Sequence, residues 1–154
     1  MKNAFTMIEL IFVIVVIGIL AAIAIPKLAV TRDDAKISTI VSNAKIILGD
    51  FQSFYTSHGN SRWKSENVIK ATSVAFGTAC DSPVTETTQL SSETFVLCND
   101  DVICLSFTTI DEGNLTITDG VDTTDIICEA VKSDPVIIAI SNRTYKLGGK
   151  TVVR

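Results

Sequence analysis

The chain has 154 residues, enough for one small domain and an additional segment. Its 13 Lys and Arg face 17 Asp and Glu, so the formal net charge is −4 and we expect no direct binding of nucleic acid, which favours a basic surface. The hydrophobic fraction of 47% and the mean hydropathy of +0.39 are high for a soluble protein. Much of that excess lies in the first 25 residues.

A long apolar segment opens the chain, with no charged residue from Leu10 to Ile25. As a helix, the stretch from Phe5 to Ile25 is about 31 Å long, which matches a hydrocarbon core of about 30 Å. Glu9 stands at the head of this stretch, where a charge costs roughly 2.5–3.5 kcal/mol to insert. We therefore expect Glu9 to have a partner.

The helical pattern continues after Pro26, which is expected to kink the helix without ending it. Apolar residues then recur in steps of three and four, which predicts one buried stripe on an amphipathic helix running to about Ser57. The segment Ser57-His58-Gly59-Asn60-Ser61 is predicted to stop it. The predicted stripe comprises Ile37, Ile40, Val41, Ala44, Ile47, Leu48, Phe51, Phe54 and Tyr55.

The remainder predicts a small antiparallel sheet. Ser65 is a candidate N-cap of a short helix over Trp63–Thr72, and residues 77–93 resemble a loop. A period of two then predicts strands, and Gly148-Gly149 predicts a hairpin turn. The expected strands are Thr94–Leu97, Val102–Thr109, Leu115–Thr118, Ile126–Val131, Val136–Ser141, Thr144–Leu147 and Thr151–Val153. The predicted fold class is α+β: a long N-terminal helix, transmembrane in its first half and amphipathic in its second, packed on this sheet.

Four cysteines, Cys80, Cys98, Cys104 and Cys128, favour two disulfides in an oxidising compartment. A zinc site is less favoured, because no Cys-x-x-Cys occurs and the only histidine, His58, is distant in sequence. Three pairings are possible. A staple between Cys98 and Cys104 around a hairpin, with Cys80 joined to Cys128, is one expectation, and the sequence leaves the choice open.

Acidic residues gather around a glycine-containing turn region, as Asp111, Glu112, Asp119, Asp122 and Asp125. Calcium prefers oxygen ligands from such loops, which makes Asp119, Asp122 and Asp125 candidate ligands. Their spacing does not match an EF-hand, so solvated loop acids are the favoured interpretation. No metal or other cofactor is otherwise expected.

Three ordinary explanations compete for the first 26 residues. A secretory signal peptide cut near Ala22-Ile23-Ala24 would leave a secreted soluble domain, but neither Glu9 nor the continuing helical stripe fits it. A plain membrane anchor for an enzyme or ligand-binding domain leaves Glu9 unexplained. A buried core helix is disfavoured by the length of the apolar run.

The segment Lys2-Asn3-Ala4-Phe5-Thr6-Met7-Ile8-Glu9 resembles the processing site of type IV pilin-like proteins, which include type IV pilins and the pseudopilins of type II secretion and competence. The resemblance implies cleavage by a prepilin peptidase between Ala4 and Phe5, with N-methylation of Phe5. It extends to about Asp34 and divides the chain into a leader peptide (1–4), a transmembrane and assembly helix (5–26), an amphipathic helix (27–58) and a globular head (59–154).

In this family Glu9 would neutralise the terminal amine of a neighbouring copy. Gly18 and Pro26 would loosen the helix in filament assembly. The resemblance thus implies a structural subunit, not an enzyme, that self-assembles into a helical filament. Its implied partners are minor pseudopilins, the prepilin peptidase, an inner-membrane assembly platform with its ATPase, and membrane lipid around the monomer.

The segment Thr31-Arg32-Asp33-Asp34-Ala35-Lys36 and the short head favour a type II secretion pseudopilin that drives protein secretion. A competence pseudopilin for DNA uptake and a surface type IV pilin are alternatives, and a membrane-anchored periplasmic enzyme or ligand-binding domain is a further one. The resemblance and the cysteines imply a single-pass protein of the bacterial inner membrane with its head in the periplasm. The filament would be periplasmic or on the cell surface.

Overall fold

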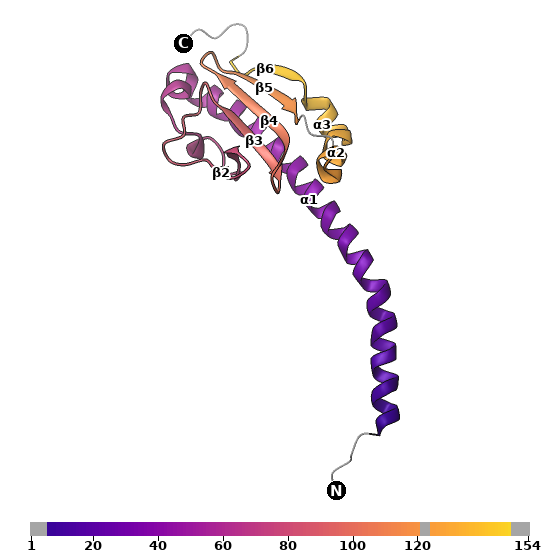
Figure 1. Cartoon of the computed structure of the whole chain (residues 1–154). Coiled ribbons are helices and arrows are strands. Elements are labelled where there is room, and N and C mark those ends of the chain that lie inside the picture. Colours follow the sequence, from indigo (N-terminus) through magenta and orange to yellow (C-terminus); the bar gives the residue numbers. More distant parts are fainter. Residues whose placement is uncertain (1–5, 121–123, 149–154) are drawn as a thin grey trace. The chain divides into compact units, whose positions relative to one another are not determined.

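The computed structural model describes residues 6–120 and 124–148, with Pro26 and Ala29 described by their backbone alone. Residue contacts divide the chain into two compact units, Met1–Ala35 and Lys36–Arg154. Helix α1 (Met7–Ser65) contributes to both units, and every other element belongs to the second (Figure 1).

In the first unit α1 has no core of its own. Its large apolar side chains from Met7 to Val30 are 38–78% exposed. By length and composition the helix can cross a membrane. The backbone stays helical through Pro26, so the prediction that this proline does not end the helix is confirmed, whereas the predicted kink stays a prediction.

In the second unit α1 buries the predicted stripe. Ala44, Ile47 and Phe51 are fully buried, and the other members of the stripe are buried or half-buried. The predicted stop is also found: Gly59 has a φ of 74° and a ψ of 179°, which interrupts the helix. Glycine suits this left-handed φ because it has no Cβ. A further short helical stretch then runs to Ser65.

One antiparallel sheet of six strands, in the order β2-β1-β3-β4-β5-β6, forms the other layer of the head. The expected strands that begin at Thr94, Val102, Leu115 and Thr144 are confirmed within a residue or two at each end. The strands are β1 (Gly77–Ala79), β2 (Ser82–Pro83), β3 (Thr94–Asn99), β4 (Val102–Ile110), β5 (Asn114–Asp119) and β6 (Arg143–Lys146).

The two faces of the sheet differ because side chains alternate along each strand. Phe95, Phe107 and Ile117 stand opposite one another on β3, β4 and β5 and are fully buried. Phe51 of α1 packs on Phe95 with ring centroids 6.2 Å apart, and the ring of Trp63 lies 5.7 Å from that of Phe51. The aromatic core expected beneath the sheet is therefore confirmed.

Two expected strands are helices: α2 (Ile126–Ser133) and α3 (Pro135–Ile140). The strand predictions Ile126–Val131 and Val136–Ser141 are wrong because a capping residue precedes each segment. The carboxylate of Asp125 accepts from the backbone N of Cys128, and that of Asp134 accepts from the backbone N of Val136. These bonds satisfy donors that the first turn of a helix leaves open, and they outweigh the β-branched residues that follow.

The segment after α1 also differs from expectation. Ser65 ends α1 instead of capping a new helix, and only the short 3₁₀ helix η1 (Val68–Lys70) follows, with Asn67 at its N-cap position. The expected strand Thr151–Val153 and the second glycine of the predicted hairpin turn lie outside the described residues.

The disulfides join Cys80 to Cys98 and Cys104 to Cys128, with Cα–Cα distances of 5.6 and 4.7 Å. Two disulfides are confirmed, but the pairing of Cys98 with Cys104 and of Cys80 with Cys128 is wrong. In the β3–β4 ladder Cys98 stands opposite Ile103, so the next residue, Cys104, points to the other face of the sheet. The cysteines that flank this turn therefore cannot meet.

Candidate functional site

The N-terminus of α1 forms a capping box. The hydroxyl of Thr6 and its backbone N both donate to Oε2 of Glu9, at 2.7 and 2.8 Å. The backbone N of Glu9 donates in return to the hydroxyl of Thr6 at 3.3 Å. Two backbone donors of the first helical turn are thereby satisfied by side chains three residues apart.

Thr6 is a residue that the sequence analysis missed, although a threonine three residues before a glutamate and an apolar run is a known signature of a helix start. The structure shows that Glu9 has a partner within its own chain. Both Thr6 bonds fall on Oε2, and Oε1 of Glu9 accepts no hydrogen bond from any residue that the structure describes.

The other predicted assembly residues lie along the same helix and are not brought together. Gly18 is nine residues after Glu9 and Pro26 eight residues further, so about 14 and 12 Å of helix separate them. A Cβ added at Gly18 would meet no atom within 4 Å, so this glycine leaves an open notch in the side-chain surface of the helix. Ala4 and Phe5 lie outside the described residues.

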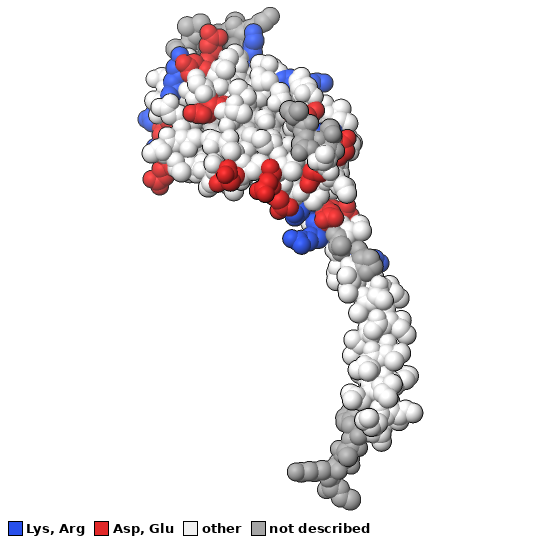
Figure 2. Space-filling view, in the orientation of Figure 1, with Lys and Arg blue, Asp and Glu red and all other residues white. Residues whose placement is uncertain are grey.

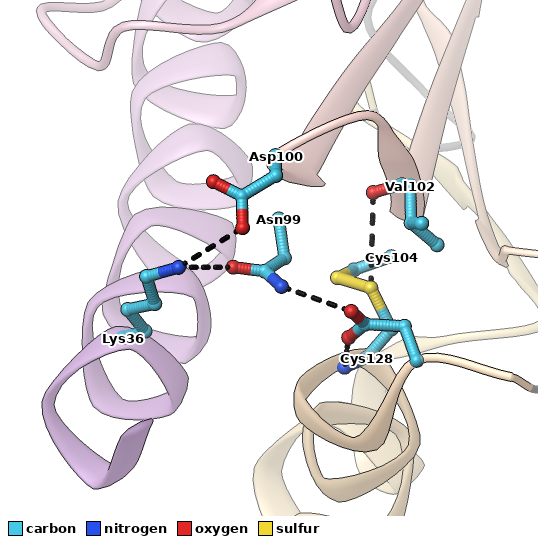
Figure 3. A network of polar contacts seen from close by, with 7 residues as sticks. Lys36, Asn99, Asp100, Val102, Cys104 and Cys128 are labelled. Atoms are coloured by element: carbon cyan, nitrogen blue, oxygen red, sulfur yellow. Dashed lines mark hydrogen bonds and ion pairs between the residues drawn. A yellow bond between two sulfur atoms is a disulfide. The ribbon is translucent and has the colours of Figure 1, made fainter. Parts of the chain in front are cut away.

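In the head, a polar network ties α1 to the sheet and to α2 (Figure 3). Nζ of Lys36 donates to Oδ1 of Asn99 at 3.0 Å and contacts Oδ2 of Asp100 at 3.2 Å. Nδ2 of Asn99 donates to Oδ2 of Asp125 at 3.0 Å, and Oδ1 of Asp125 caps α2 through the backbone N of Cys128 at 2.7 Å. Asn99 is 6% exposed, and both ends of its amide are satisfied.

The disulfide Cys104–Cys128 adjoins this network. Its Cys128 sulfur lies 3.7 Å from the carbonyl oxygen of Val102, a contact without a hydrogen bond because a disulfide sulfur carries no proton. The network thus connects α1, the β3–β4 turn and α2. We interpret it as a brace of the head.

The candidate calcium ligands are only partly described. Asp125 uses both oxygens within the head, as a helix cap and as an acceptor from Asn99. Asp119 accepts from Nδ2 of Asn142 at 2.7 Å through Oδ2, while its buried Oδ1 has no partner. Asp122 lies outside the described residues. Within residues 6–120 and 124–148, no three His, Cys, Asp or Glu side chains gather as metal ligands do.

A cavity of about 310 Å³ lies beside the interruption of α1 and is lined by Tyr55–Ser61 and Gly148. It contains Ser57 and His58, whose Oγ and Nδ1 are 2.8 Å apart. The hydroxyl of Ser57 already reaches the carbonyl oxygen of Ser53 at 2.8 Å, and Nδ1 of His58 reaches that of Phe54 at 3.2 Å. Both side chains thus make local contacts with backbone carbonyls of the preceding helical turn, as side chains at the end of a helix commonly do.

Charge is distributed differently on the two units. Between Leu10 and Ile25 the surface of α1 carries no charged side chain, whereas acidic and basic side chains are spread over the head (Figure 2). The head therefore presents an ordinary soluble surface, and the first unit presents a surface suited to lipid or to other apolar helices.

Residues 1–25 match the family model of the prokaryotic N-terminal methylation motif. Comparisons with curated proteins and with solved structures find no match. The motif is the prepilin signature of type IV pilin-like proteins, and the long apolar helix followed by a small antiparallel sheet gives a pilin-like α+β architecture.

The motif therefore supports a type IV pilin-like or pseudopilin subunit, and the family that carries this motif is structural. Its motif implies processing by a prepilin peptidase and assembly into a filament, and together with the apolar helix it fits anchoring in a membrane. The resemblance inferred from the first residues is confirmed.

Proposed function

We propose that this protein is a pseudopilin of a type II secretion system, a structural subunit whose filament drives protein secretion across the cell envelope. The observation that carries the proposal is the N-terminal methylation motif followed by a helix whose large apolar side chains from Met7 to Val30 are exposed. Such a surface suits lipid around the monomer and packing between helices in a filament. Subunits repeating head to tail with a rotation generate a helix.

Cleavage after Ala4 would expose the amine of Phe5, which is then methylated. In the filament this ammonium pairs with Glu9 of an adjacent copy, and breaking one half of such a buried pair costs about 3–5 kcal/mol. The pair thus sets the register between subunits. Gly18 and Pro26 loosen the helix as subunits leave the lipid and pack together.

The head would lie in the periplasm, with α1 crossing the inner membrane once. Two disulfides support this placement, because they form and persist in oxidising compartments. The filament works with minor pseudopilins, an inner-membrane platform and its ATPase. No catalytic step is assigned to this chain, and it binds no nucleic acid directly.

We further propose that the head needs no calcium. Asp125 is committed to the cap of α2, and the disulfides already brace the loop after β1 and the N-terminal end of α2. Hydrogen bonds within the head account for both oxygens of Asp125 and for Oδ2 of Asp119.

The mature N-terminus provides the first test. Intact-mass and N-terminal analysis of protein purified from the native membrane should find a chain that begins at Phe5 with about 14 Da added, the mass of one methyl group. A chain that begins near Ile25 would indicate a signal peptide, and one that begins at Met1 would contradict prepilin processing.

A second test replaces Glu9. Glu9→Ala should insert normally into the membrane but fail to form fibres that can be sheared from cells, because the neighbouring ammonium loses its partner. Ile8→Ala is the matched control, since it shortens an exposed neighbour without removing a charge. Normal fibres and normal transport by the Glu9→Ala protein would contradict the register role.

The biological system is tested by deleting the gene and measuring protein secretion, DNA uptake and the formation of surface fibres. Loss of protein secretion supports the proposal. Loss of DNA uptake alone would instead identify a competence pseudopilin, and loss of surface fibres alone a type IV pilin. Retention of all three with loss of an enzymatic or ligand-binding activity would identify a membrane-anchored periplasmic domain.

A further inference from the structure

The two disulfides of the head differ in exposure. Cys104 and Cys128 are fully buried, whereas Cys80 and Cys98 are half-buried. Thiol–disulfide exchange requires a thiolate to reach a sulfur, so exposure selects the bond that reacts. We propose that Cys80–Cys98 is a thiol-exchange site for a dithiol reductant, and that its opening releases β1 and β2 from β3 while the rest of the head stays folded. The proposal concerns the head alone and goes beyond the filament function.

The surroundings of Cys80 leave this disulfide open to a reductant. Cys80 lies in the turn between β1 and β2, at one edge of the sheet. Cys98 lies on β3 directly after the register shift of the β3–β4 ladder, opposite Ile103, which is itself exposed. The neighbours of Cys80 along β1, the turn and β2 include the exposed residues Thr78, Asp81, Ser82 and Pro83. A small dithiol can therefore approach the bond without unfolding the head.

Few contacts other than the disulfide hold β1 and β2 in place. β1 has three residues and β2 has two, and the described ladder joins β1 to β3 through one pair, Gly77 opposite Val96. Phe76, directly before β1, is anchored in the core, since it is buried and its ring centroid lies 5.1 Å from that of Phe95. Opening the disulfide therefore frees the segment after Phe76 and leaves Phe76 itself packed.

The disulfide Cys104–Cys128 has the opposite setting. Cys128 lies on α2, where Ile127 and Val131 are also buried and the carboxylate of Asp125 caps the helix. A thiolate can reach this bond only after α2 has moved away from the sheet. Opening a buried part of a core costs more free energy than opening an exposed turn, so this disulfide should stay closed under conditions that open Cys80–Cys98.

The exchange takes its electrons from the reductant. One thiolate of the dithiol attacks the sulfur of Cys80 or Cys98, so that a new S–S bond forms to the attacked sulfur and the bond between the two cysteines breaks. The other cysteine leaves as a thiolate and takes a proton from water. The second thiol of the reductant then loses its proton and closes the reductant's own disulfide, which releases the attacked cysteine. Two electrons thus pass from the dithiol to the cysteine pair, and an oxidised dithiol reverses the reaction.

The test uses the oxidised full-length chain in phospholipid nanodiscs, with dithiothreitol as the reductant. Free thiols are blocked with N-ethylmaleimide at intervals, and peptide mass analysis gives the reduced fraction of each disulfide. The fluorescence of Trp63, the only tryptophan and a fully buried one, reports whether the core stays folded in the same samples. Hydrogen exchange of peptides that span β1 and β4 is compared before and after the first disulfide opens.

Cys80–Cys98 should be reduced at least about a hundredfold faster than Cys104–Cys128, with the fluorescence of Trp63 unchanged. Exchange in β1 should then become at least about tenfold faster, while exchange in β4 stays within about twofold. Equal rates of reduction, or reduction of Cys80–Cys98 only when Trp63 becomes exposed, would overturn the proposal. Fast reduction with unchanged exchange in β1 would overturn it as well, because other contacts would then hold this segment.

Two matched variants separate the effect of the disulfide from that of the reductant. The chain with both Cys80→Ser and Cys98→Ser should show the fast exchange in β1 without dithiothreitol. The chain with both Cys104→Ser and Cys128→Ser keeps the exposed disulfide and should show slow exchange in β1 until dithiothreitol is added. Slow exchange in β1 of the first variant would contradict the release, and the rates measured on the unchanged chain do not depend on either variant folding.

The proposed function fails separately. Absence of fibres or of secretion would leave the reduction rates of the two disulfides as they are. Equal reduction rates would remove the exchange site and leave the filament role intact.

Discussion

The two units of this chain obtain their structure from different sources. The head buries aromatic and aliphatic side chains between α1 and one face of its sheet, and two disulfides close its loops. In the first unit, the described large apolar side chains from Met7 to Val30 are exposed along one helix. We therefore expect the head to fold by itself, whereas the surface of the first unit suits lipid or other apolar helices.

Polar groups show the same contrast. In the head, Asn99 is buried and both ends of its amide are paired, so the network that includes Lys36 and Asp125 is complete. In the first unit, Glu9 has one paired oxygen and one that accepts no hydrogen bond from the described residues. A buried polar network whose hydrogen bonds are satisfied makes a fold more rigid.

The largest effect is expected from separating the units. A chain that begins at Arg32 lacks the apolar segment but keeps every buried residue of the head. It should move from the membrane fraction to the soluble fraction and still melt cooperatively, as followed by circular dichroism and sedimentation. Aggregation, or the absence of a melting transition, would show that the head depends on the first unit.

Loss of Trp63 should have the largest effect within the head. Its side chain is fully buried, contacts the rings of Phe51 and Tyr55, and donates through Nε1 to the carbonyl oxygen of Ile110 at 2.9 Å. Trp63→Ala should lower the free energy of unfolding by about 3–5 kcal/mol. Denaturant unfolding of the soluble head measures this loss of unfolding free energy. Ile46→Ala, at a 45% exposed position on the same helix, should cost less than about 1 kcal/mol.

The disulfides come next in size. Replacing Cys104 and Cys128 together by serine opens a loop of 24 residues and removes a link between β4 and α2, which should cost about 2–4 kcal/mol. Denaturant unfolding of the oxidised head compares the two proteins. A change below about 0.5 kcal/mol would show that the capping network holds α2 without the disulfide.

The oxidised head with both disulfides also tests whether calcium contributes to its stability. Adding a chelator such as EGTA to the oxidised head should leave its melting temperature unchanged, since Asp125 is used inside the protein. A fall in melting temperature that calcium reverses would show that Asp119, Asp122 and Asp125 bind the ion.

The sequence predicted those features that depend on local periodicity. The apolar run and the stripe through Phe51 predict the two parts of α1, since a step of three or four residues repeats over many turns. Gly59 marks the interruption because only glycine adopts its φ at no cost. Strand β5 and the second half of β4 follow from their alternation of buried and more exposed residues.

The wrong predictions concern segments in which a helix cap or the strand register, and not the local hydrophobic pattern, determines the structure. Asp125 and Asp134 convert two β-branched segments to helices by capping them, and the ladder register separates Cys98 from Cys104. Capping signals were present in the sequence at these aspartates and at Thr6. The register of the β3–β4 pair could not be predicted from the sequence, because it depends on a register shift between Leu97 and Cys98.

The smallest effect concerns acid stability of the head. The ammonium of Lys70, hydrogen-bonded to Glu66 at 2.6 Å, and the guanidinium of Arg62 hold the pKa of Glu66 below its ordinary value. Because the folded pKa is depressed, this stabilisation is present above the unfolded pKa of about 4.3 and is lost as the pH falls through the folded value.

Glu66→Gln should therefore melt at a lower temperature than the unchanged head at pH 7, and the difference should disappear as the pH falls through the depressed folded pKa of Glu66. Glu86→Gln, which alters an exposed carboxylate with no ion pair among the described residues, is the control. Salt should reduce the Glu66 effect because its cationic partners are largely exposed. A difference that persists unchanged at low pH would instead indicate that Glu66 acts through packing, and the ion pairs would then contribute nothing to the stability of the head.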